Sequence, residues 1–166
     1  MEHVENRWVF GEVGEFVEYR MATIVRKAVA GDANAVLVLT NDFATSFIVD
    51  ENTFHVSFES LLNKSNACLL VAEMESRVVG YALAFFHHTF FANGRVAWIE
   101  EIMVHPDYRR TGIGKELMHN IETWATDQKC RLIALATRRA SAFYEANEYE
   151  DSATYYRKLL ARLCAA

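Results

Sequence analysis

The chain has 166 residues, of which 52% are hydrophobic and 23% charged, enough to bury roughly 70% of its unfolded surface in one domain. The formal charge of −5 argues against nucleic acid as the main partner, and no apolar run is long enough to span a membrane. Cys68, Cys130 and Cys164 are scattered, with no C-x-x-C pair, which favours reduced thiols in a cytoplasmic protein and argues against a zinc site.

The N-terminal residues are expected to form an arm ahead of a compact domain. Residues 8–19 alternate loosely between apolar and polar and contain two glycines, which suits a short hairpin or an extended arm. We therefore divide the chain into an arm at 1–20, a single domain at 21–160 and a tail at 161–166.

The domain is expected to begin with a strand at residues 22–28, followed by two helices. The first helix opens at Gly31-Asp32-Ala33 and runs to about Leu39, with Asp32 as its N-cap. The second is expected at residues 56–63, after the polar stretch 50–53.

The middle of the chain reads as three strands joined by tight turns. The turns are Glu75-Ser76-Arg77 and Asn93-Gly94, and the second is a strong hairpin signal. The strands are expected at residues 67–74, 78–88 and 95–104. A periodic helix follows from Ile113, and the remaining elements are a strand at 132–136, a helix at 138–147 and a final strand at 152–157. This order indicates a mixed α/β sheet with helices on both faces.

The segment between the third strand and the periodic helix has the features of an anion site. Gly112 and Gly114 lack the Cβ atoms that would keep a phosphate from the main chain, and the first helical turn has N–H groups without intrahelical partners. Arg109, Arg110 and Lys115 add positive charge around that turn. We interpret it as a seat for a diphosphate.

Two other glycine motifs do not fit this segment. A P-loop needs a glycine where Arg109 stands and a Ser or Thr where Glu116 stands. A dinucleotide fingerprint needs a third glycine at the position of Leu117. The alternative to a phosphate seat is a plain glycine turn before a surface helix.

The segment resembles the coenzyme-binding signature of the GNAT superfamily, the acetyl-CoA-dependent N-acyltransferases. Arg109-x-x-Gly112-x-Gly114 matches the motif [Gln/Arg]-x-x-Gly-x-[Gly/Ala] without a gap. The resemblance extends over residues 22–158 and implies the GNAT fold, a mixed, mostly antiparallel sheet splayed between its fourth and fifth strands. Those strands would be residues 95–104 and 132–136.

The resemblance also implies how acetyl-CoA is held. Its pantetheine arm would lie in the splay and pair with main-chain groups of Ile102, Met103 and Val104, as an added strand would. The diphosphate contacts fall on Arg109, Arg110, Thr111, Gly112, Ile113, Gly114 and Lys115. Thr137, where the family usually has Asn, and Ser141 complete the implied coenzyme contacts, together with Tyr144.

Residues 138–145 resemble the family's fourth helix, in which Tyr144 matches the tyrosine that protonates the leaving thiolate. A phenol with a pKa near ~10 suits that task. The alternative is a buried tyrosine with a structural hydroxyl. Glu148 replaces the glycine that usually ends this helix, and Asn147 is expected to take the left-handed cap instead.

The general base is expected among the residues of the splayed strand. Glu100 matches the glutamate of spermidine/spermine acetyltransferases, and Glu101 should point to the opposite sheet face by strand alternation. Either could be a solvated strand carboxylate instead. His87 and His88, at the end of the neighbouring strand, are alternatives as base or substrate contact.

The resemblance implies an N-acetyltransferase that moves an acetyl group from acetyl-CoA to a primary amine of a small molecule or a protein. Transfer would be direct, in a ternary complex, and no metal is expected. A covalent acyl-enzyme is disfavoured because the three cysteines lie outside the motifs. The alternative is a non-catalytic acyl-CoA-binding sensor or interaction module. Many relatives are dimers, so a homodimer is expected. The acceptor should be set by residues 42–60 and 87–93 and by the C-terminal strand.

Overall fold

The computed structural model describes residues 8–10, 16–18, 23–44 and 47–159. The tail expected at 161–166 and most of the arm lie outside these residues. Within them, β1 (Trp8–Phe10) pairs with β2 (Phe16–Glu18) as an antiparallel ribbon. The chain divides into two compact units, residues 1–135 and 136–166. None of the helices formed by the described residues is long and apolar enough to cross a membrane.

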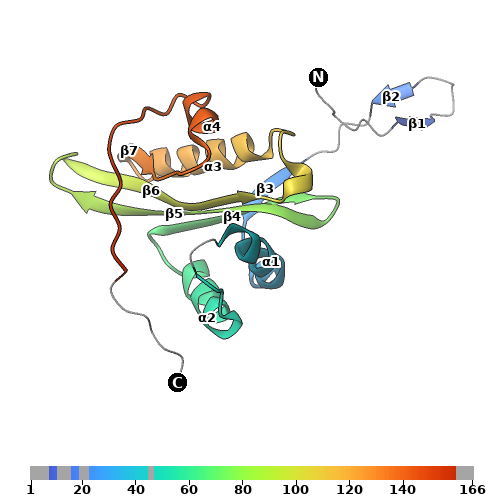
Figure 1. Ribbon diagram of the computed structural model, residues 1–166, viewed down its shortest axis with the longest axis horizontal. Helices are drawn as coiled ribbons and strands as arrows, with labels where there is room; N and C mark the ends of the chain where they lie inside the picture. The colour runs from blue at the N-terminus through green and yellow to red at the C-terminus, as the bar shows by residue number, and fades with distance from the viewer. Residues whose placement is uncertain (1–7, 11–15, 19–22, 45–46, 160–166) are drawn as a thin grey trace. The chain divides into compact units, whose positions relative to one another are not determined.

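A five-stranded sheet forms the centre of the first unit, in the order β3-β4-β5-β6-β7 (Figure 1). Successive neighbours are antiparallel except β6 and β7, which are parallel. Glu75 and Ser76, between β4 and β5, have positive φ angles of 50° and 62°, as a two-residue hairpin turn requires. The strands are β3 (Ile24–Lys27), β4 (Ala67–Met74), β5 (Arg77–Thr89), β6 (Gly94–Val104) and β7 (Cys130–Leu135).

Helices cover both faces of this sheet, which confirms the expected fold class (Figure 1). On one face lie α1 (Ala33–Phe43) and α2 (Glu51–Leu62), and on the other lies α3 (Ile113–Asp127). The α3 side is packed by the apolar stripe expected from the sequence, with Ile113, Leu117 and Ile121 fully buried. The core beneath α1 and α2 consists of Val36, Leu39, Phe58, Leu69, Val71, Tyr81, Leu83 and Met103.

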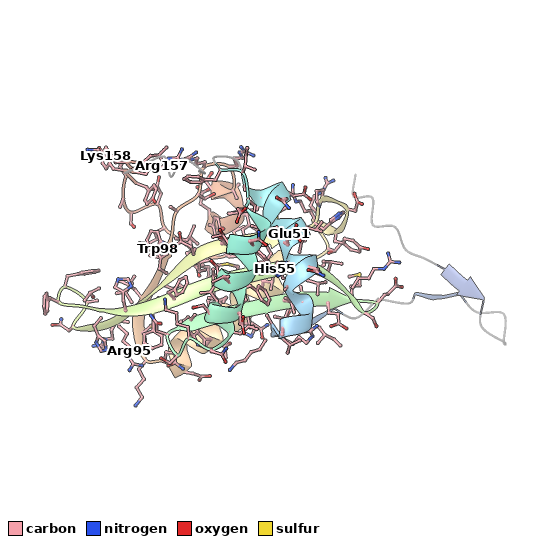
Figure 2. The ribbon with its side chains drawn as sticks, turned by 90° about the horizontal axis from the view of Figure 1, so that it is seen from below. Glu51, His55, Arg95, Trp98, Arg157 and Lys158 are labelled. Carbon is pink, nitrogen blue, oxygen red and sulfur yellow. The ribbon has the colours of Figure 1, made fainter. Side chains whose placement is uncertain are left out.

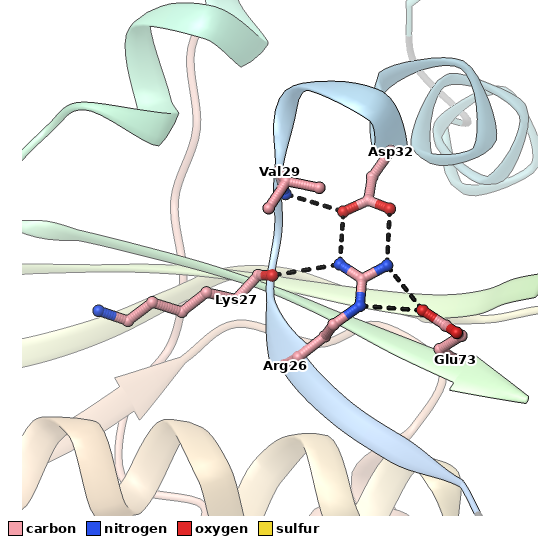
Figure 3. A network of polar contacts seen from close by, with 5 residues as sticks. All are labelled: Arg26, Lys27, Val29, Asp32 and Glu73. Carbon is pink, nitrogen blue, oxygen red and sulfur yellow. Dashed lines mark hydrogen bonds and ion pairs between the residues drawn. The ribbon is translucent and has the colours of Figure 1, made fainter. Parts of the chain in front are cut away.

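The start of α1 differs from the expectation, because the Asp32 carboxylate does not cap this helix. Instead it accepts hydrogen bonds from both terminal nitrogens of Arg26, at 2.7 and 2.9 Å, and from the Val29 N–H (Figure 3). Arg26 also donates to Glu73 on β4. Asp32 is only 6% exposed, and a buried carboxylate needs a charged partner. Its carboxylate therefore pairs with the Arg26 guanidinium and not with the N–H groups at the start of α1. The network joins β3, β4 and the 3-10 turn Ala30–Asp32.

Two further helix boundaries were placed wrongly from the sequence. The second helix starts at Glu51 rather than at residue 56, because Asp50 accepts a hydrogen bond from the Thr53 N–H and caps it. The first helix continues to Phe43, four residues beyond Leu39.

The second unit contains one short helix, α4 (Ser141–Glu145), and no strand among its described residues. The strand expected at 152–157 is therefore wrong, since these side chains are exposed and the segment has no regular structure. The left-handed cap after α4 is also different from the expectation, because Glu148 adopts it itself, with a φ of 65°. Asn147 instead donates from its side chain to the Phe143 carbonyl.

Candidate functional site

The parallel strand β7 pairs along its length with only the first part of β6. The pairing runs from Arg95 to Ile99 on β6, and β6 then continues to Val104 with only β5 beside it. Main-chain groups of Ile102, Met103 and Val104 on the β7 side thus have no strand partner among the described residues. This free edge of β6 lies where the splay between the fourth and fifth strands was expected, and it offers a place for a ligand with strand-like amides.

A β-bulge lies on β6 where its pairing with β7 ends. Leu83 on β5 is opposite Glu101, whereas the next residue, Ala84, is opposite Ile99. Glu100 is therefore the extra residue of β6, and its side chain is exposed. Bulges bend a strand and re-aim its side chains, and they are common beside active sites. The bulge thus places the exposed Glu100 carboxylate next to the point where β6 loses its β7 partner.

The bulge changes the relation between the two glutamates. Strand alternation alone would place Glu100 and Glu101 on opposite faces, but alternation restarts after an inserted residue. Glu101 is opposite Leu83 and Met103 is opposite Tyr81, so both lie over the core beneath α1 and α2. Trp98, opposite Phe85, lies on the same face.

The Glu101 carboxylate has a buried partner that the sequence did not suggest. The Tyr81 hydroxyl lies 2.7 Å from Glu101 Oε2, and Tyr81 is only 1% exposed. Burial raises the pKa of Glu101, and the nearby Glu100 charge raises it further, while the Tyr81 hydrogen bond acts in the opposite direction. Burial likewise raises the pKa of the Tyr81 phenol, so it stays protonated.

The glycine turn leads into α3 as the sequence predicts. Gly112 is the N-cap residue of α3 and has a φ of 97°, a conformation that favours glycine. An added Cβ there would meet no atom within 4 Å, so the turn borders open space. No side chain caps the first turn of α3, and its N–H groups remain available to an anion. Arg110, Thr111 and Lys115 are exposed around it, and Ile113 is buried beneath it.

Arg109 has a structural contact in addition to its charge. Its Nε donates to the Val104 carbonyl at 3.0 Å, and Nη2 lies 3.7 Å from Met103 Sδ. The side chain therefore ties the glycine turn to the end of β6. Thr111 makes a further tie within the turn, because its hydroxyl donates to the Tyr108 carbonyl.

Tyr144 lies on α4 in the second unit and is buried. Its ring makes edge-on contacts with Phe143 and Tyr149, and burial raises the pKa of the phenol. Thr137 Oγ1 accepts hydrogen bonds from the Arg139 and Ala140 N–H groups, so it orders the turn before α4. Ser141 is exposed at the start of that helix.

Other polar residues are spread along the sheet and its helices. His87 and His88 are exposed near the end of β5, and Arg95 at the start of β6 donates to His88 Nε2 and to the Gln128 carbonyl. Figure 2 shows that Arg95 and Trp98 come from β6, and that Glu51 and His55 come from neighbouring turns of α2. His87 and His88 lie away from the bulge at Glu100, because His87 is opposite Val96 on β6.

Comparison with known proteins matches residues 36–149 to the model of the acetyltransferase (GNAT) family. Over 78 residues the chain is 35% identical to a thialysine N-epsilon-acetyltransferase of Bos taurus, covering 45% of each protein. Over 83 residues it is 29% identical to an aminoglycoside N(6')-acetyltransferase of Salmonella typhimurium, covering 48% of this chain and 57% of that protein. The chain thus spans about half the length of the curated relatives it matches.

Solved structures agree on the fold. A glucosamine-6-phosphate N-acetyltransferase from Arabidopsis thaliana superposes with a TM-score of 0.76 at 18% identity, covering 84% of this chain and 99% of that chain. An aminoglycoside N-acetyltransferase in complex with CoA gives a TM-score of 0.71 at 18% identity, covering 86% and 98%. At such low identities the likeness shows the fold alone.

Proposed function

The chain belongs to the GNAT family of acetyltransferases, and from that premise we propose that it transfers an acetyl group from acetyl-CoA to a primary amine in a ternary complex. The observation that carries the proposal is the bulge at Glu100, which brings an exposed carboxylate to the point where the pairing of β6 with β7 ends. A small-molecule amine is the favoured acceptor, because the curated relatives are named for thialysine and aminoglycosides.

The residues of the first unit fit acetyl-CoA, which would supply the acetyl group as an activated thioester. The edge of β6 at Ile102, Met103 and Val104 has no strand partner and can bind the pantetheine amides, except at the Val104 carbonyl, which accepts from Arg109. The open space at Gly112 and the uncapped start of α3 suit the diphosphate, with Arg110 and Lys115 as exposed cations beside it. The hydrogen bond from Arg109 to the Val104 carbonyl connects the glycine turn to the end of β6 and so fixes the two proposed binding regions relative to each other.

Glu100 acts as the general base in this proposal. An amine must be neutral to attack a thioester, and a solvent-accessible carboxylate can take its proton directly or through water. Main-chain N–H groups of Ile102 to Val104 are proposed to stabilise the oxyanion. Tyr144 is proposed to give its proton to the leaving thiolate, and a phenol whose pKa is raised by burial keeps that proton at neutral pH.

A thiol-release assay with acetyl-CoA and a broad panel of amines tests the proposal, with calorimetry of CoA binding beside it. Release that depends on an amine, and that falls when Glu100 is replaced by Gln, would support acetyl transfer. Binding of CoA without release for any amine would favour the non-catalytic sensor. Absence of CoA binding in folded protein would contradict both functions.

The homodimer and the cytoplasmic location remain predictions. Light scattering on the intact chain would decide the first, and a monomer at micromolar concentration would contradict it. Fractionation of cells that make the protein would decide the second.

A further inference from the structure

Glu101 lies on the face of the sheet that carries α1 and α2, whereas the glycine turn leads into α3 on the other face (Figure 1). The edge of β6 between them is the proposed place of the pantetheine arm. The coenzyme would thus reach the reaction point from the α3 side, which leaves the α1 and α2 side for the acceptor amine. Glu101 is therefore placed to contact the acceptor and not the coenzyme.

One oxygen of the Glu101 carboxylate is held by a hydroxyl from the core. The Tyr81 hydroxyl donates to Glu101 Oε2 at 2.7 Å, and Tyr81 is only 1% exposed. Thr40 Oγ1 lies 3.3 Å from the Tyr81 oxygen but 2.8 Å from the Val36 carbonyl, which takes its single hydrogen. The Tyr81 hydrogen is thus committed to the carboxylate. A short bond of this kind fixes the orientation of the carboxylate and stabilises its ionised form.

The other oxygen, Glu101 Oε1, is open to a ligand. It has no hydrogen-bond partner in the part of the chain that the structure describes. No buried side-chain oxygen there lacks a partner, so Oε1 must be accessible to solvent. None of the ion pairs of the described residues includes Glu101. A half-buried carboxylate without a cation is costly, and a cationic ligand at Oε1 would remove that cost.

Glu100 places a second negative charge beside Glu101. It is the exposed inserted residue of the bulge, and it too takes part in none of the ion pairs between described residues. The Glu100 charge raises the pKa of Glu101, so the two carboxylates repel each other. An amine with one positive charge can neutralise only one of them, whereas an amine with two positive centres can neutralise both.

An aromatic pair continues this face of the sheet beyond the bulge. Trp98 on β6 is opposite Phe85 on β5, and both side chains are half-buried (Figure 2). Lys64 Nζ lies 5.5 Å from the centroid of the Phe85 ring, so the pair already accommodates a cation. The Trp98 ring makes no ring or cation contact with another described residue. Its exposed part is available to the methylene groups of an amine bound at Glu101.

We propose that Glu101 binds a second cationic centre of the acceptor, so that the favoured substrates are small amines with two positive charges. Glu100 takes the proton of the attacking amine, whose neutral nitrogen bonds to the acetyl carbon as the carbon–sulfur bond breaks and the thiolate takes the Tyr144 proton. The ammonium group at Glu101 keeps its charge and orients the substrate. Tyr81 is a positioning residue, since it acts through Glu101. This inference rests on the proposed acetyl transfer, but the preference for two charges can be measured without turnover.

Calorimetry on the intact protein, with and without CoA, tests the subsite. The probes are the diamines from propane-1,3-diamine to pentane-1,5-diamine, each paired with the monoamine of the same length. At least one diamine should bind roughly tenfold or more tightly than its monoamine, well above the statistical advantage of two identical ends. Glu101→Gln should lose most of this preference. Glu59→Gln, at an exposed glutamate on α2, is the matched control and should keep it.

Three results of the calorimetry would overturn the subsite. They are equal affinities for diamine and monoamine in the wild type, no binding of either at millimolar concentration, and an undiminished preference in Glu101→Gln. An equal loss in Glu59→Gln would show attraction by the overall negative charge of the protein, and would overturn it as well.

The role of Tyr81 has a separate test. Tyr81→Phe keeps the ring and should weaken diamine binding by roughly three- to tenfold, because the carboxylate stays but is no longer held. Thr40→Val leaves the bond between Tyr81 and Glu101 intact and should keep the preference. The double variant Tyr81→Phe/Glu101→Gln should bind diamines as Glu101→Gln does. Additive losses would overturn the positioning role. Thermal melts identify a Tyr81→Phe that fails to fold, and Glu101→Gln then decides.

Activity separates the failure of this inference from the failure of the proposed function. With acetyl-CoA, Glu101→Gln should lower the diamine-to-monoamine ratio of kcat/KM by roughly tenfold, mainly through KM, whereas Glu100→Gln should lower kcat for both amines. If amines are acetylated and Glu101→Gln keeps the wild-type ratio, the subsite is wrong and the function stands. If diamines bind selectively and no amine is acetylated, the function is wrong and the cation subsite stands.

Discussion

Arg109 and Val104 are joined by a hydrogen bond of 3.0 Å, from the guanidinium Nε to the strand carbonyl. The bond connects the turn that precedes α3 with the end of β6, the two parts proposed to hold the diphosphate and the pantetheine arm of the coenzyme. An arginine that the sequence marks as a phosphate contact therefore also fixes the geometry of the site.

We predict that Arg109→Met weakens coenzyme binding by roughly five- to tenfold, the value of about one hydrogen bond. Arg109→Gln keeps an N–H donor without the charge and should bind more tightly than Arg109→Met. Calorimetry with CoA compares the two. If both variants lose affinity equally, and the loss vanishes at high salt, the guanidinium acts by charge and the bond to Val104 is unimportant.

Gly114→Val should reduce CoA affinity by at least roughly tenfold, or ~1.4 kcal/mol. Gly114 lies within the first turn of α3, so a branched side chain there crowds the main-chain N–H groups that the diphosphate would approach. Because Gly114 is helical, valine should not unfold the protein, unlike a substitution at Gly112 with its φ of 97°. Gly31→Val, at a glycine with open space in the 3-10 turn before α1, is the control. Normal binding by folded Gly114→Val would refute this seat.

Tyr144→Phe should leave CoA affinity unchanged while turnover falls by roughly one to three orders of magnitude. The substitution removes only the hydroxyl and keeps the ring contacts with Phe143 and Tyr149. The loss should persist between neutral and moderately alkaline pH, because a missing acid is not replaced by deprotonating the amine. Steady-state rates across this range provide the measurement. Full activity would leave Tyr144 with a packing role.

Glu100→Gln should also retain CoA affinity, but its defect should shrink as pH rises. At higher pH more of the amine substrate is already neutral, so fewer substrate molecules need a base to remove a proton. Rate profiles of wild type and variant with the same amine would reveal the convergence. A defect that does not depend on pH, or no defect, would place the base elsewhere.

The network around Arg26 should make stability depend on acid pH. The Arg26 guanidinium holds the pKa of the Asp32 carboxyl below its ordinary value, opposed in part by burial. A lowered folded-state pKa contributes stability above the ordinary pKa of 3.8, and this stability is lost as pH falls through the folded-state value. Asp32→Asn should therefore lower the free energy of unfolding at neutral pH by about 1.5–3 kcal/mol, with little effect in strong acid.

Urea titrations at neutral and acid pH check the Asp32 prediction. Asp50→Asn is the control, because that carboxylate caps α2 in an exposed position and should matter less. A loss for Asp32→Asn that is the same at both pH values would mean that the ion pair is not its cause.

Much of the fold could be predicted from patterns within the sequence. The strands at 67–74 and 95–104 were predicted almost to the residue, because alternating apolar residues end at turn signals such as Asn93-Gly94. The glycine turn and the start of α3 at Ile113 were also predicted correctly. The strand predicted at 152–157 is wrong, because β-prone residues form a strand only where a neighbouring strand edge pairs with them.

The sequence by itself determined the order of elements, the family motif and the set of candidate carboxylates, because each is a local pattern of residue types and spacings. Tertiary structure decided how those residues are used. The insertion of Glu100 as a bulge depends on the register with β5, and the partners of Asp32, Glu101 and Arg109 come from other elements. Such contacts depend on which strands and helices become neighbours, and no spacing along one segment can specify them.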